Sequence, residues 1–174
     1  MTPLRASRPT SGVLATLSAL ALSGCLYGFS GGLPPDIKTV ALIPFENFTA
    51  EPTLTQDVNN SVKDALEGRL GLRAASERQA DAVVRGSITR YDPDVPVAYT
   101  GGPAGQQNQV QVTQRRVMMI VTIEITNQKT GAVIWSKSGM SVEGDYGPGQ
   151  ELDGRRKALE QLANNIVEGA QSQW

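Results

Sequence analysis

Apolar residues recur along this chain with two different periods, and the shorter one predicts four strands. Strict alternation over 117–126 indicates a strand with one buried face. Runs rich in β-branched residues predict further strands at 38–43, 82–91 and 132–142, and Gly131 in the connection before the last one is typical of a hairpin. The predicted inward-facing residues are Val117, Met119, Val121, Ile123 and Ile125 of the third strand and Ala82, Val84 and Ile88 of the second.

The longer period predicts two amphipathic helices, at 54–70 and 152–170. Thr53, followed three residues later by Gln56, has the spacing of a capping box, and Gly68 or Gly71 would end the first helix. Arg155 and Arg156 are expected on the solvent side of the second helix. The apolar stripe of the first helix comprises Leu54, Val58, Val62, Ala65, Leu66 and Leu70, and that of the second comprises Leu152, Leu159, Leu162, Ala163, Ile166, Val167 and Ala170.

The order strand, helix, three strands, helix predicts the fold class. A helix between the first two strands permits a right-handed parallel crossover, whereas the short later connection requires an antiparallel pair. Because each helix has one apolar stripe, we expect an α/β (α+β) two-layer sandwich, in which both helices cover one face of a mixed four-stranded sheet. The segment 91–94, Tyr-Asp-Pro-Asp, is interpreted as a turn, and 100–109 as a loop that either is a solvated connector or contacts a partner.

The N-terminal sequence is typical of a targeting signal. Two arginines precede about ten mostly apolar residues, a run too short to span a bilayer, and the run closes with Leu-Ser-Gly-Cys at 22–25. This ending resembles the lipobox of bacterial lipoproteins, so we expect a signal peptide over 1–24, a lipid on the sulfur of Cys25, a tether over 25–36 and a single domain over 37–174. In such lipoproteins an aspartate after the cysteine retains the protein in the inner membrane, so Leu26 implies the periplasmic face of the outer membrane.

Composition argues against several classes of function. The chain has no histidine and one cysteine, which removes His-based catalytic triads and Cys- or His-ligated metal sites, and we expect neither an enzyme nor a bound cofactor beyond the lipid on Cys25. Cleavage after Gly24 would leave 14 basic and 17 acidic residues, a net charge of −3 that disfavours nucleic-acid binding. Basic residues beside predicted loops and at a helix start are candidates for an anionic partner: Arg115, Arg116, Lys129, Arg155 and Arg156.

Three segments resemble, in order, the LptE-type lipopolysaccharide-assembly lipoproteins. They are 33–49 (LPPDIKTVALIPFENFT), 80–88 (ADAVVRGSI) and 129–135 (KTGAVIW), followed by a closing helix near Trp174. The resemblance implies a plug inside an LptD-like outer-membrane β-barrel translocon that contacts lipopolysaccharide through basic residues. Related lipoproteins leave two alternatives, an outer-membrane activator of a peptidoglycan synthase and a secretion-channel subunit. The short tether disfavours the first, and the absence of predicted amphipathic membrane strands disfavours the second.

Overall fold

The computed structural model describes residues 33–100 and 111–172, which belong to one compact unit. The predicted signal peptide, Cys25, most of the tether and nearly all of the 100–109 loop lie outside the described residues. The elements are, in chain order, β1 (Thr39–Leu42), β2 (Glu46–Asn47), α2 (Leu54–Asp64) continued by a π-helical turn (Ala65–Arg69), β3 (Arg73–Ala74), β4 (Ala82–Thr100), β5 (Gln111–Asn127), β6 (Val133–Tyr146) and α3 (Glu151–Ser172).

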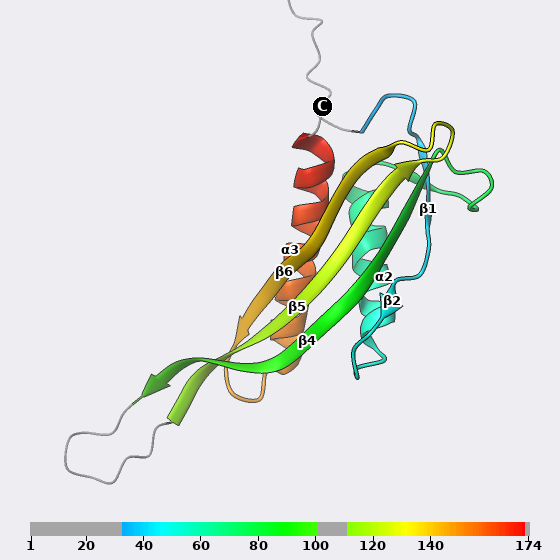
Figure 1. Cartoon of the computed structure of the whole chain (residues 1–174). Coiled ribbons are helices and arrows are strands. Elements are labelled where there is room, and N and C mark those ends of the chain that lie inside the picture. Colours follow the sequence, from blue (N-terminus) through cyan, green and yellow to red (C-terminus); the bar gives the residue numbers. More distant parts are fainter. Residues whose placement is uncertain (1–32, 101–110, 173–174) are drawn as a thin grey trace, which may run out of the picture. The chain divides into compact units, whose positions relative to one another are not determined.

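The strands form one mixed sheet in the order β3-β1-β4-β5-β6, with β2 also paired to β4 (Figure 1). β1 runs parallel to β3 and β4, and β5 runs antiparallel to both of its neighbours, β4 and β6. The predicted crossover, hairpin and two-layer fold are therefore confirmed. The sheet has six strands rather than four, because β2 and β3 contain two residues each and such short strands leave no periodic signal in the sequence.

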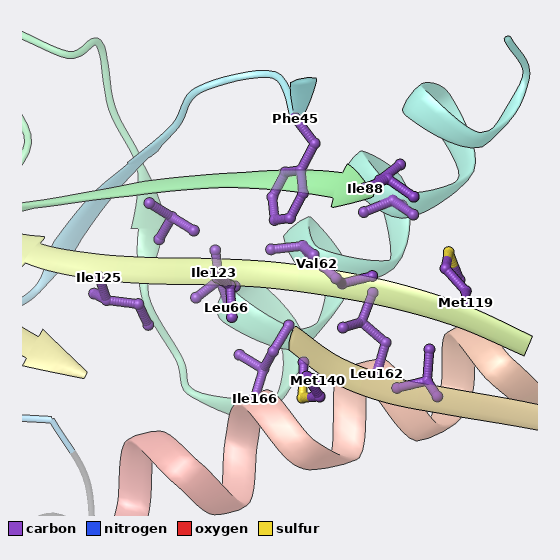
Figure 2. Close-up of a cluster of buried hydrophobic side chains, with 14 of the residues drawn as sticks. Phe45, Val62, Leu66, Ile88, Met119, Ile123, Ile125, Met140, Leu162 and Ile166 are labelled. Carbon is purple, nitrogen blue, oxygen red and sulfur yellow. The ribbon is translucent and has the colours of Figure 1, made fainter. Parts of the chain in front are cut away.

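Both helices cover the same face of the sheet, and the core lies between the layers (Figures 1 and 2). All the residues predicted to face inward from β4 and β5 are fully buried. They meet Val62 and Leu66 of the first helical segment and Leu162 and Ile166 of α3. At the contact between β6 and α3, a Cβ added to Gly144 would overlap the carbonyl oxygen of Gly154, so two glycines set how closely this helix approaches the sheet.

Three local predictions are wrong. Thr53 precedes α2 but makes no capping bond, because its hydroxyl donates instead to Glu51 at 2.5 Å. Leu152 is 75% exposed, because the face of α3 that packs on the sheet contains Gly154, Ala158 and Leu162, and Leu152, two positions before Gly154, lies on the other side of the helix. Asp92, Pro93 and Asp94 lie within β4, where the pairing shifts register between Asp92 and Val95, and a proline is tolerated at such a bulge.

Candidate functional site

The candidate basic residues lie on elements at two different ends of the domain (Figure 1). The hairpin end is where β4 and β5 extend beyond β6 and where both helices begin; we define it as residues 46–57, 89–99, 111–116 and 143–157. The tether end contains Leu33, the β3–β4 connection and the β5–β6 turn. Arg115, Arg116, Arg155 and Arg156 lie at the hairpin end, and Lys129 lies in the turn at the tether end.

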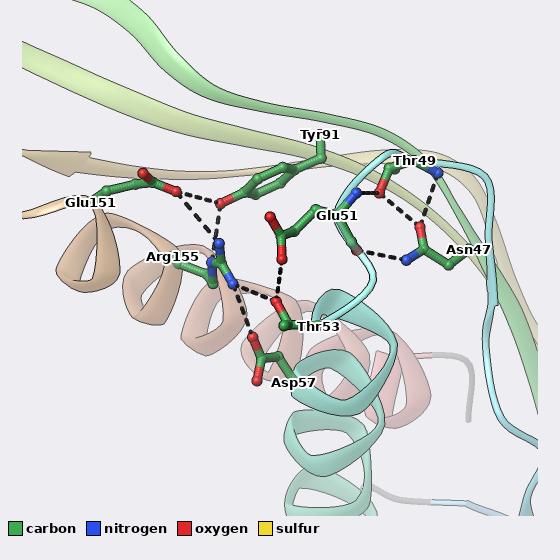
Figure 3. A network of polar contacts seen from close by, with 8 residues as sticks. All are labelled: Asn47, Thr49, Glu51, Thr53, Asp57, Tyr91, Glu151 and Arg155. Carbon is green, nitrogen blue, oxygen red and sulfur yellow. Dashed lines mark hydrogen bonds and ion pairs between the residues drawn. The ribbon is translucent and has the colours of Figure 1, made fainter.

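Arg155 is the centre of a polar network that joins α2, β4 and α3 (Figure 3). Its guanidinium donates to the Tyr91 hydroxyl at 3.0 Å and to the Thr53 hydroxyl at 2.9 Å. It also reaches Asp57 and Glu151, both at 3.4 Å, and its centre lies 5.3 Å from the centroid of the Tyr91 ring. The side chain is only 13% exposed, so the expectation that Arg155 faces solvent is wrong and its contacts hold the two helices to the sheet.

The same network shifts the pKa of Tyr91. Burial of the phenol is the largest cause and raises its pKa to about 12, while the charge of Arg155 opposes the rise. Burial disfavours the charged phenolate more strongly than the nearby guanidinium stabilises it. Tyr91 is therefore a neutral hydrogen-bond donor to Glu151 (3.1 Å) at every physiological pH.

The segment 45–49, Phe-Glu-Asn-Phe-Thr, shapes the connection into α2. The ring of Phe45 is buried and occupies the space where a side chain at residue 86 would lie, which explains Gly86 in β4. The Asn47 side chain accepts from the backbone and hydroxyl of Thr49 at 2.9 and 2.8 Å and donates to the Glu51 carbonyl at 2.8 Å (Figure 3). These residues stabilise a loop, as Asn and Thr commonly do, and none of these contacts involves a candidate basic residue.

The other arginines of the hairpin end are neutralised by nearby carboxylates. Arg115 pairs with Asp94, and Arg156 pairs with Asp153 at 3.0 Å. Arg116 binds both oxygens of Asp145, at 2.5 and 3.1 Å, and also Glu143 at 2.6 Å. The hydrogen bond from Arg116 lowers the pKa of Asp145. Arg90 pairs with Asp92, so every arginine among the described residues of this end has an acidic neighbour.

Lys129 differs from these arginines, because its carboxylate partner also accepts hydrogen bonds from other donors. Its ammonium lies 2.6 Å from one oxygen of Asp81 and is 61% exposed. The other oxygen of Asp81 accepts from the backbone of Lys38 and from the backbone and hydroxyl of Thr39, at 2.8 to 3.1 Å. These donors, led by Lys129, hold the pKa of Asp81 far below its usual range. Lys129 can therefore exchange partners without leaving Asp81 unpaired.

Sequence reasoning located these cations but not their partners. Two pairs have a helical spacing that the sequence shows directly: Glu151 with Arg155, four residues apart, and Asp153 with Arg156, three residues apart. Thr53, Asp57 and Tyr91 reach Arg155 from more than 60 residues away, and no local pattern predicts such contacts.

The fold and the candidate site define a class of protein: a small two-layer α+β domain in which the described helices cover one face of the sheet and the candidate basic residues pair with carboxylates. The chain belongs to the LptE family, described as lipopolysaccharide-assembly, whose match covers residues 37–171. The resemblance drawn from the three sequence segments is thereby confirmed.

Solved structures with related folds share little sequence with the chain. The PelC dodecamer from Paraburkholderia phytofirmans is 19% identical, with a TM-score of 0.48, and the match covers 79% of this chain and 92% of that one. The hypothetical protein CT253 from Chlamydia trachomatis is 11% identical, with a TM-score of 0.49 and coverage of 78% and 98%. Lipoprotein GNA1162 from Neisseria meningitidis is 12% identical, with a TM-score of 0.42 and coverage of 74% and 94%. No curated protein matches the chain.

Among the described residues, none of the helices has the length and apolar character needed to cross a bilayer.

Proposed function

We propose that this protein is a lipid-anchored, non-catalytic component of the outer-membrane lipopolysaccharide assembly machinery, docked in an LptD-like β-barrel translocon and contacting lipopolysaccharide. The observation that carries the proposal is the LptE family match, which spans the whole described domain. Of the candidate basic residues, Arg115, Arg116, Lys129 and Arg156 are partly or largely exposed and lie in surface ion pairs, as is expected of groups that recognise an anionic partner.

The sheet face opposite the helices supports docking inside a barrel. On β5 it presents Thr122, Glu124 and Thr126, and Thr122 lies beside Ser87 of β4. Such hydroxyl and charged groups suit the polar interior of an outer-membrane barrel better than they suit a lipid surface. The face is therefore compatible with a plug that makes hydrogen bonds to a lumen wall.

Lys129 is the candidate best placed to bind a lipopolysaccharide phosphate. It is more exposed than Arg115 or Arg116, and Asp81 keeps three other donors when the ammonium leaves. Arg155 is committed to the helix–sheet network, so we assign it to folding instead. Leu33, which packs on the core, lies eight positions after Cys25, so lipidation would hold the tether end within about 30 Å of the anchor.

A binding measurement with purified lipopolysaccharide tests this assignment. Lys129→Ala should weaken binding about tenfold, because a charge-assisted bond to phosphate is lost. Lys137→Ala is the matched control, since Lys137 is an exposed lysine of the neighbouring strand without an ion pair among the described residues. Equal binding by the Lys129 variant and wild type would remove Lys129 from the site, provided that both fold equally by circular dichroism.

Affinity purification of the lipidated protein from its own cells tests the wider proposal. Recovery of a large outer-membrane β-barrel protein is the expected result. Recovery of a peptidoglycan synthase in its place would favour the alternative and contradict the translocon assignment.

A further inference from the structure

The charge of the domain is distributed unevenly between its parts. The hairpin end contains nine acidic and six basic residues, a net charge of −3. The remaining described residues contain eight of each sign and are neutral. The whole net negative charge of the described chain is therefore concentrated at the end where β4 and β5 project.

The arginines of this end do not offer free positive charge. Arg116 is shared by Glu143 and Asp145, and Arg155 is shared by Asp57 and Glu151. Glu46 is exposed, and no ion pair neutralises it among the described residues. A phosphorylated lipid would be repelled here, whereas lysine or arginine side chains of a partner would be attracted.

Exposed apolar side chains gather at the same end. Phe48 is 67% exposed, Val97 38%, Tyr99 57% and Leu152 75%. Of the large apolar side chains that are exposed in the described residues, only Val133 lies elsewhere. Single exposed apolar residues are ordinary, but several within an acidic surface are typical of a protein-binding site.

The projecting part of the hairpin adds a structural reason for a partner. Beyond Asp92, β4 pairs only with β5, and β6 ends opposite Arg115 (Figure 1). Tyr99 faces Val112 across this two-stranded ribbon, and neither α2 nor α3 covers the ribbon. A two-stranded ribbon in water is marginally stable, so a protein surface packed against it would stabilise it.

We propose that the hairpin end is the surface by which this protein docks onto its protein partner, and that the partner presents basic side chains around an apolar recess. The partner is the barrel translocon if the proposed function holds, so the inference rests on that function only for the partner's identity. The chemistry expected of the partner's surface follows from the acidic charge and the exposed apolar residues of this chain, whichever protein the partner is.

Site-specific photo-crosslinking in the protein's own cells tests the inference. The full-length chain carries a photoreactive amino acid at Phe48, Tyr99 or Leu152, with Val133 as the matched exposed apolar control, and crosslinked species are identified by mass spectrometry. We expect one and the same protein to crosslink from the three hairpin-end positions, and to do so more strongly than from Val133, which pairs with Thr126 on the open sheet face. A second test compares Glu46→Lys with Glu168→Lys, which makes the same charge change at an exposed position near the end of α3. Glu46→Lys should lower partner crosslinking about fivefold at low salt, and this reduction should be smaller at high salt, where the charges are screened. Glu168→Lys should leave partner crosslinking unchanged.

The outcomes separate this inference from the proposed function. A barrel crosslinked from Val133 alone overturns the inference and leaves the function standing. A different protein crosslinked from the hairpin end, with sensitivity to Glu46→Lys, supports the inference and overturns the translocon assignment. Crosslinks from the hairpin end to lipopolysaccharide instead of protein, or no crosslink from any position, contradict the inference.

Discussion

Replacing Arg155 by alanine tests whether this residue stabilises the fold or is available to a ligand. The guanidinium is 13% exposed and makes two short hydrogen bonds, to Tyr91 and Thr53. Arg156 follows it directly on the same helix, is 66% exposed and, among the described residues, forms an ion pair with Asp153 alone. The two adjacent arginines therefore form a matched pair with opposite expected behaviour.

The structure sets the size of the effect. A hydrogen bond to a charged group contributes about 1.5–3 kcal/mol, and a cation over an aromatic ring about 0.5–1 kcal/mol. After truncation, the Tyr91 hydroxyl keeps Glu151 and the Thr53 hydroxyl keeps Glu51, which reduces the loss. We expect Arg155→Ala to lower the free energy of unfolding by about 2–4 kcal/mol, and Arg156→Ala by less than about 0.5 kcal/mol.

Urea denaturation of the purified protein, followed by circular dichroism, measures both values. For a domain of this size the Arg155 variant should also melt roughly 5–15 °C below wild type. Equal losses in the two variants, or a loss below about 0.5 kcal/mol for Arg155→Ala, would refute the reasoning that the network of Figure 3 holds the helices to the sheet.

Two further predictions concern packing and pH. Gly144→Ala should destabilise the domain by about 1–3 kcal/mol, because the added methyl overlaps the Gly154 carbonyl. Gly68→Ala is the control: a methyl there meets open space and should stabilise the helix by about 0.5–1 kcal/mol. A higher melting temperature for Gly144→Ala than for Gly68→Ala would contradict the packing between β6 and α3. Burial raises the pKa of Tyr91 to about 12 in the folded state, so the stability that depends on its neutral form is complete below about pH 10 and is lost as the pH rises toward 12. Unfolding free energies measured across this range should vary less with pH for Tyr91→Phe than for wild type, and an equal pH dependence would contradict this role of the phenol.

Periodicity alone located the main elements of this domain. The alternation along β5 and the stripe of the first helix correspond to buried faces, because burial against a single core imposes the period of each element. A sequence order that permits a parallel crossover and then requires a hairpin was enough to predict the two-layer arrangement. The family resemblance was likewise carried by local segments, which the match over 37–171 confirms.

The character of the candidate site required the tertiary structure. The sequence showed five basic residues, but for four of them the partners Asp94, Asp145, Asp81 and Asp57 come from other parts of the chain, and only folding brings them into contact. Electrostatic interaction depends on distance through space rather than along the chain. Composition therefore determined the net charge of −3 of the described residues, whereas the fold decided that this charge collects at the hairpin end. For the same reason, only the fold distinguishes the buried Arg155 from the exposed Arg156 beside it.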